Sequence, residues 1–201
     1  MRNRVPSRLL WALLAGLVVS AGCASLGGRS ARVPQLPAIE LPERWEARRS
    51  ALQAWPGYEM RGRVAVARGD EGFAGSLRWA HRTLGTLLEL DGPLGVGGVR
   101  YAFPPDADAG ALEQALGVPV PLSSLRFWLL GVPDPDPSLT ADEAVDRDRG
   151  RLISLRQAGW EIDYPQYAAV VGTRLELPQR IEVRREGLRV RLFIETWQGA
   201  P

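Results

Sequence analysis

Apolar and polar positions change their period along the chain, and each change predicts a different element. Residues 43–55 are rich in helix formers, carry apolar residues three to four apart and stop at Pro56-Gly57. This pattern predicts an amphipathic helix. From Tyr58 to Ala67 the period becomes two, with Val64 and Val66 on one side and arginines on the other. This alternation predicts a strand that buries one face.

The same alternation, interrupted by turns rich in Gly, Asp and Pro, recurs through the rest of the chain. We expect further strands at 73–81, 84–90, 152–157, 160–164, 174–177, 180–185 and 188–197. Two short helices are expected at 111–116 and 122–130. The alternating prolines of 133–137 predict a loop, and the carboxylates from Asp134 to Asp148 are expected to make it an acidic loop.

These elements sum to a mainly β fold, an antiparallel sheet with a few short helices. Such a sheet has one apolar face that must be covered. Three short helices would cover it only in part. The sheet therefore either curls on itself as a barrel or half-barrel, or exposes a cleft lined with apolar groups.

The first 22 residues have the composition of a secretory signal peptide. Arg2, Arg4 and Arg8 precede an apolar run over 9–19 and a tail of small residues. The run is shorter than the ~20 residues that a membrane-spanning helix needs. Residues 23–42, rich in Pro and Gly, are expected to be a flexible tether, and 43–201 the folded domain.

Charge and residue usage exclude several classes of function. All 25 basic residues are Arg, but removal of the signal peptide leaves 22 basic against 23 acidic groups, so we expect no nucleic-acid partner. The chain has one cysteine and one histidine, which is too few for a zinc, haem or iron–sulfur site. We expect no metal and no cofactor, and we expect that the protein is not an enzyme. His81 is interpreted as structural.

The tail of the signal segment, Ala21-Gly22-Cys23, resembles the lipobox of bacterial lipoproteins, in which the cysteine is acylated and becomes the N-terminus. Ser20 stands where that motif usually has leucine. The alternative is an ordinary cleavage site with an incidental cysteine. Acylation predicts stable anchoring through Cys23. By resemblance to lipoproteins of Gram-negative bacteria, Ala24 directs the protein to the outer membrane.

Six sequence blocks, in this order, resemble the LolB family of outer-membrane lipoprotein receptors. They are RGRVAV (61–66), SLRW (76–79), GPLG (92–95), VPLSSLRFWLLG (120–131), QAGW (157–160) and LPQRI (177–181). The resemblance covers most of residues 43–197. It departs from the family between Gly95 and Gly110, where a further pair of strands is missing or reduced.

The resemblance implies an incomplete antiparallel β-barrel, capped by helices, around an apolar cavity that holds the acyl chains of another lipoprotein. Such a protein, acting as a monomer, accepts acylated lipoprotein cargo from the periplasmic carrier LolA and inserts it into the inner leaflet of the outer membrane. The loop of Pro93, Leu94 and Gly95 would touch outer-membrane lipid during insertion. The alternative is a lipid-anchored envelope protein that binds glycolipid or has a structural role.

Inward-facing positions of the strands are the candidates for the cavity wall, although ordinary core packing predicts the same set. They are Val64, Val66, Leu77, Trp79, Leu88, Leu90, Trp160 and Ile162.

Overall fold

A computed structural model describes residues 44–93, 97–107, 110–173 and 175–199 of the 201-residue chain. These residues form three helices, which are α1 (Trp45–Gln53), α2 (Ala111–Leu116) and α3 (Leu122–Trp128). They also form nine strands, which are β1 (Tyr58–Arg68), β2 (Glu71–Arg82), β3 (Gly85–Asp91), β4 (Val99–Phe103), β5 (Ala141–Asp146), β6 (Arg151–Gln157), β7 (Trp160–Ala169), β8 (Glu176–Arg185) and β9 (Leu188–Gly199).

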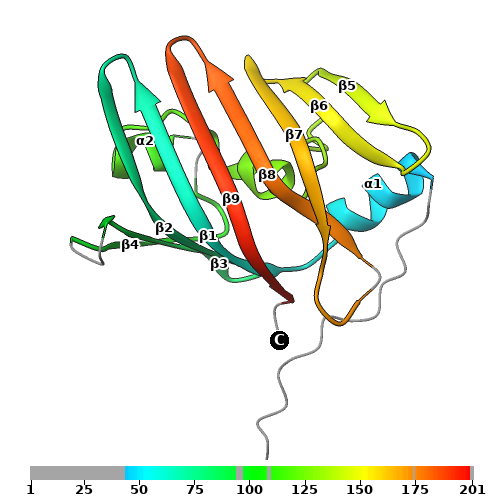
Figure 1. Ribbon diagram of the computed structural model, residues 1–201, viewed down its shortest axis with the longest axis horizontal. Helices are drawn as coiled ribbons and strands as arrows, with labels where there is room; N and C mark the ends of the chain where they lie inside the picture. Colours follow the sequence, from blue (N-terminus) through cyan, green and yellow to red (C-terminus); the bar gives the residue numbers. More distant parts are fainter. Residues whose placement is uncertain (1–43, 94–96, 108–109, 174, 200–201) are drawn as a thin grey trace, which may run out of the picture. The chain divides into compact units, whose positions relative to one another are not determined.

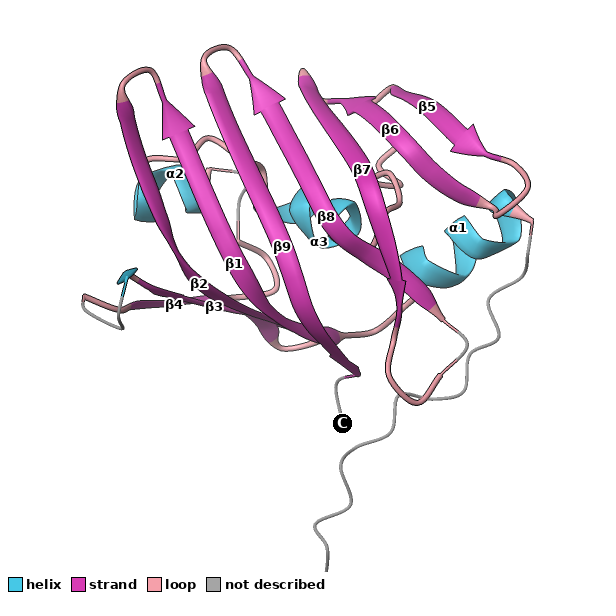
Figure 2. Cartoon of the chain, viewed as in Figure 1, coloured by secondary structure: helices cyan, strands magenta, loops and turns pink. Residues whose placement is uncertain are grey.

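All nine strands belong to one antiparallel sheet, in the order β4-β3-β2-β1-β9-β8-β7-β6-β5. The first strand pairs with the last at the centre, Met60 opposite Trp197, and each half of the chain extends outward from there. Strands β4 and β5 are free edges, so among the described residues the sheet curls without closing. The three helices lie on one face of it (Figures 1 and 2). This confirms the predicted mainly β fold and incomplete antiparallel barrel capped by helices.

The sheet bends at its centre, where β1 and β9 approach closely. Their register shifts between Arg61 and Gly62, which marks a β-bulge. A Cβ atom at Gly62 would overlap the carbonyl oxygen of Phe193 on β9. Only glycine permits this approach, which strengthens the local twist and curls the sheet around its apolar face.

Helix α3 is fixed to the sheet through its C-terminal carbonyls. The last carbonyls of a helix lack partners within it and need donors from elsewhere. The buried hydroxyl of Tyr58 on β1 donates to the carbonyl of Arg126 at 2.7 Å, and that of Tyr164 on β7 donates to the carbonyl of Trp128 at 2.9 Å. Burial raises the pKa of both tyrosines, so these hydroxyls stay protonated donors. Strands from both halves of the sheet therefore fix the helix.

A second set of hydrogen bonds converges on Gln157 at the end of β6, which is only 2% exposed. Its Oε1 accepts from the Trp128 indole and from the backbone N–H of Asp134, each at 2.9 Å. Its Nε2 donates to the carbonyl of Asp134 at 3.0 Å. The Asp134 carboxylate in turn accepts from the Ser124 hydroxyl at 2.6 Å. Gln157 thus ties α3 and the following loop to the sheet.

The prediction of an acidic loop over 134–148 was wrong for its second half, which contains β5. The side chains there have basic or indole partners rather than solvent alone. Glu143 accepts from the Trp45 indole at 2.8 Å and from Arg49 at 3.1 Å. Asp146 pairs with Arg149 and Arg151. Charged residues are expected on an edge strand because they oppose edge-to-edge association. Because of these charged residues, the sequence of β5 lacks the apolar alternation that predicts a strand.

The predicted strand ends were also wrong at two prolines, Pro165 and Pro178. The expected strand 160–164 continues through Pro165 to Ala169, and the two short strands expected at 174–177 and 180–185 are one strand, β8, that contains Pro178. Residue 174 lies outside the described residues. The β7–β8 register shifts on both sides of Gln166. This irregularity accommodates residues that cannot donate to a ladder.

The segment that departs from the family pattern supplies one strand rather than a pair. Within the described residues after Pro93, only β4 precedes α2, and it pairs with β3 as the edge of the sheet, Leu88 opposite Tyr101. The described residues therefore contain one strand where the resemblance implies a pair.

Replacement of Gln157 by leucine tests the role of these hydrogen bonds. The change leaves the Trp128 and Asp134 N–H groups and the Asp134 carbonyl buried without their partner. At about 1–3 kcal/mol for each unsatisfied group, the free energy of unfolding should fall by at least about 3 kcal/mol in urea titration. Gln166→Leu, at an exposed position of β7, is the matched control and should change it by less than about 0.5 kcal/mol. Equal effects of the two changes would contradict this role.

Candidate functional site

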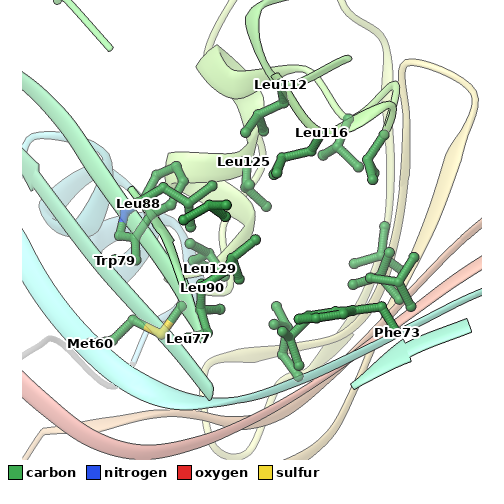
Figure 3. Close-up of a pocket in the computed structure, with 18 of the residues that line it drawn as sticks. Met60, Phe73, Leu77, Trp79, Leu88, Leu90, Leu112, Leu116, Leu125 and Leu129 are labelled. Carbon is green, nitrogen blue, oxygen red and sulfur yellow. The ribbon is translucent and has the colours of Figure 1, made fainter. Parts of the chain in front are cut away.

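An apolar cavity of about 440 Å³ lies between the concave face of the sheet and helices α2 and α3 (Figure 3). This volume is within the range of ligand-binding pockets. Every lining residue is apolar. They are Met60, Val64, Val66, Phe73, Leu77, Trp79, Leu88, Leu90, Gly97, Val99, Leu112, Leu116, Val118, Val120, Leu125, Leu129, Val183, Val190 and Leu192.

The wall consists of inward-facing side chains of the strands and of leucine side chains of the helices that face them. Alternate residues of β1, β2, β3, β8 and β9 point inward, because successive side chains of a strand lie on opposite faces. Leu112 and Leu116 of α2 are four residues apart, as are Leu125 of α3 and Leu129 at its C-cap, so each pair shares one face. Figure 3 shows these leucines directed toward the same space as Leu88 and its neighbours.

The cavity opens at the β2–β4 side of the sheet. Phe73 on β2 and Val99 on β4 both line it, yet they are 40% and 41% exposed. Single exposed apolar side chains are ordinary, but exposed apolar side chains that are continuous with an apolar cavity mark a ligand-binding groove. These two residues therefore form an apolar rim through which an apolar chain can enter or leave.

Six of the eight side chains proposed for the cavity wall lie on it, namely Val64, Val66, Leu77, Trp79, Leu88 and Leu90. Trp160 and Ile162 do not. They face the same side of the sheet, but α3 lies over them. The rings of Trp160 and Trp128 are 6.4 Å apart, and both residues belong to the packed core. The cavity is thus lined by residues of β1, β2, β3, β4, β8 and β9 and does not extend to β7.

The other sequence candidates are placed only in part. Pro93 is exposed at the end of the β3 strand, whereas Leu94, Gly95 and Cys23 lie outside the described residues. The chain that follows the loop returns to the cavity, since Gly97 lines it. Gly97 and Val99, the first described residues after Pro93 to line the cavity, therefore lie at the apolar opening.

The sequence carried signals for most of the wall residues that were not selected. Met60 and Phe73 continue the alternation of Val64 and Leu77 along β1 and β2, and Val190 and Leu192 alternate on β9. The leucine pairs of α2 and α3 were visible as i, i+4 pairs. The pattern did not show whether these side chains fill a packed core or line a cavity.

His81 has the surroundings of a structural residue. Its Nδ1 lies 2.9 Å from the hydroxyl of Thr86 on the neighbouring strand. Burial, and then the charge of Arg126, lower the pKa of His81, so the ring is neutral at neutral pH. Among the described residues, no group of three or more His, Cys, Asp or Glu side chains is placed to hold a metal ion.

No described helix is both long and apolar enough to cross a bilayer.

Comparison with known proteins places this fold and cavity in a family. Residues 101–197 match the family model "Outer membrane lipoprotein LolB". Outer-membrane lipoprotein LolB of Alkalilimnicola ehrlichii is 34% identical, over 96% of this chain and 98% of its own. The proteins of the same name from Nitrosococcus oceani and Pseudomonas putida are 32% and 31% identical, over 92% and 90% of this chain and 95% and 92% of their own.

A solved LolA-superfamily protein from Nitrosomonas europaea aligns with 76% of this chain and 94% of its own, at 10% identity and a TM-score of 0.43. The assignment of the family comes from the sequence relatives, which align along nearly the whole chain. The chain belongs to the LolB family.

Proposed function

We propose that this protein receives the acyl chains of lipoproteins in its apolar cavity and releases them into the outer membrane. The observation that carries this proposal is the cavity itself, which has an entirely apolar lining and an apolar rim at Phe73 and Val99. Membership of the LolB family, whose relatives are named outer-membrane lipoproteins, supports the same function.

The lining determines what the cavity selects. None of the lining side chains is charged, and their one hydrogen-bonding group is the Trp79 indole N–H, so a polar ligand would lose most of its water without compensation. An acyl chain gains about 0.8 kcal/mol for each CH₂ that leaves water. The site therefore binds by burial of hydrocarbon, and it does not discriminate among the polypeptides attached to the chain.

Delivery without nucleotide hydrolysis requires only that the affinity for acyl chains increases from the carrier to the cavity and from the cavity to the bilayer. Cargo moves forward if the cavity binds acyl chains more tightly than the periplasmic carrier LolA does, and less tightly than a bilayer does. LolA is accordingly the proposed donor, and outer-membrane lipid the proposed acceptor. No covalent bond changes in either step.

The N-terminal sequence supports attachment to the acceptor membrane. Acylated Cys23 would anchor the protein at the periplasmic face of the outer membrane, with residues 23–42 as tether. Twenty residues span at most about 70 Å when fully extended. The domain beginning at residue 43 would thus search for loaded carrier while staying within reach of the bilayer.

The anchor is tested by intact mass. The protein extracted from membranes should begin at Cys23 and carry about three acyl chains, since two or more hydrophobic signals are needed for stable anchoring. The mature chain with Cys23→Ala, secreted behind an ordinary signal peptide, should be recovered in the periplasm and still bind cargo. A free Cys23 thiol in the membrane-extracted protein would rule out this anchor.

The cavity is tested by placing a charge on its wall. Leu88→Asp should abolish capture of cargo from loaded carrier, because the carboxylate would have to be desolvated beside an acyl chain. Leu87→Asp is the matched control, since its side chain lies on the other face of the same strand, and it should capture cargo normally.

A second variant tests whether lost capture reflects a blocked cavity rather than a misfolded protein. Val66→Trp adds mainly apolar volume and no charge, at a half-buried position of the wall, and should reduce capture by narrowing the cavity. Capture is measured as cargo transferred from carrier to receptor on a column, with circular dichroism as the folding check. Undiminished capture by folded Leu88→Asp and Val66→Trp proteins would refute an internal acyl site.

The loop is tested at the release step. Pro93 and the glycines around Leu94 favour a tight reversal that presents one apolar side chain. Burial of one leucine in lipid contributes only about 1.5–3 kcal/mol, enough to orient a tethered domain. Leu94→Glu should take cargo from the carrier yet fail to deposit it in liposomes. Leu84→Glu, which alters a 91% exposed leucine of the β2–β3 turn, should deposit normally. Normal deposition by Leu94→Glu would show that Leu94 is merely structural.

A further inference from the structure

A groove of about 750 Å³ crosses the convex face of the sheet, on the side opposite the apolar cavity. Its floor is formed by small residues, Ala65 of β1 with Ala74 and Gly75 of β2. Arg63, Arg180 and Arg191 line it from β1, β8 and β9. We call this surface the arginine groove.

The groove has more positive than negative charge. Glu195 is engaged by Arg63 at 2.8 Å, and Glu182, which borders the groove, pairs with Arg184 at 3.4 Å. Among the described residues, no carboxylate lies within 4.0 Å of the guanidinium groups of Arg180 or Arg191. Both arginines are exposed, and their charges are available to an external anion.

The arginine groove adjoins the loop at the cavity opening. Gly92 and Pro93, at the start of the loop, border the groove. Gly97 and Val99, at its end, line the apolar cavity. Gly98 lies against the Asp91 side chain, so these two described segments are neighbours. A surface that met them would therefore find arginines on one side and an opening for hydrocarbon on the other. A phospholipid bilayer has this arrangement, with phosphates outside and acyl chains within.

We propose that Arg180 and Arg191 bind the phosphates of anionic phospholipids and so orient the cavity opening toward the bilayer. The guanidinium group offers paired N–H donors that match phosphate oxygens, and it is more weakly hydrated than an ammonium group. Each basic residue close to an anionic membrane contributes about a factor of five in binding, and the attraction is screened by salt. The role of this lipid binding rests on the proposed function, but the binding itself can be measured without cargo.

The test is sedimentation of the mature Cys23→Ala chain, which carries every described residue, with lipid vesicles. The chain should bind mixed phosphatidylcholine and phosphatidylglycerol vesicles, and less to phosphatidylcholine alone. Arg180→Gln/Arg191→Gln should lower the partition coefficient on the mixed vesicles about 25-fold, a factor of about five for each arginine. Arg147→Gln/Arg156→Gln, an equal loss of charge at exposed positions near the β5–β6 edge, should leave most of the binding intact.

Three results would overturn the proposal. The first is equal binding to both kinds of vesicle, and the second is an equal loss in the two double variants, which would indicate net charge alone. The third is a groove variant that sediments normally but no longer captures cargo from the carrier, which would make the groove a protein-docking surface. Failure of cargo transfer by the unaltered protein, with the sedimentation results as expected, would count against the proposed function and leave the lipid site standing.

Discussion

The position of α3 is the constraint on which the rest of the molecule depends. A curled antiparallel sheet has an apolar concave face that packing would ordinarily fill. Here the hydroxyls of Tyr58 and Tyr164 and the amide of Gln157 fix α3 over the β6–β8 side of that face. These hydrogen bonds are buried and directional, so the helix cannot slide toward β2 and β3 without leaving several polar groups unsatisfied. The apolar cavity is the space that remains.

The two helices at the cavity are held by contacts of different kinds. The hydrogen bonds of α3 come from fully buried groups in the core. Those at the end of α2 come from the periphery, the Tyr101 hydroxyl to the carbonyl of Ala115 and Arg68 to the carbonyl of Gly117, at 2.8 and 3.0 Å. Peripheral hydrogen bonds compete with water and are easily exchanged. The wall formed by α2 is therefore the part of the cavity that can move at least cost.

Periodicity alone was enough to predict the helices, most strands and six of the wall residues, because inward-facing positions of a strand are visible as apolar alternation. It missed the two edge strands, β4 and β5, and it broke β8 at Pro178. The charged residues of β5 pair with arginines of α1 and β6. The placement of Trp160 and Ile162 failed for a different reason. Alternation identifies a face of a strand, but whether that face meets a helix or a hollow depends on the hydrogen bonds of α3, which join residues 29 to 68 positions apart. No local pattern contains that information.

The pairing of β1 with β9 at the centre of the sheet also governs when the fold can form. These strands are the first and last of the domain, with Met60 opposite Trp197. The two halves of the sheet, β4 to β1 and β9 to β5, are joined through this pair. Contacts of such large sequence separation form late and slowly. A chain that crosses a membrane N-terminus first would lack the central ladder until its final strand had emerged. The topology thus postpones the enclosure of the apolar cavity until the last strand is available for pairing.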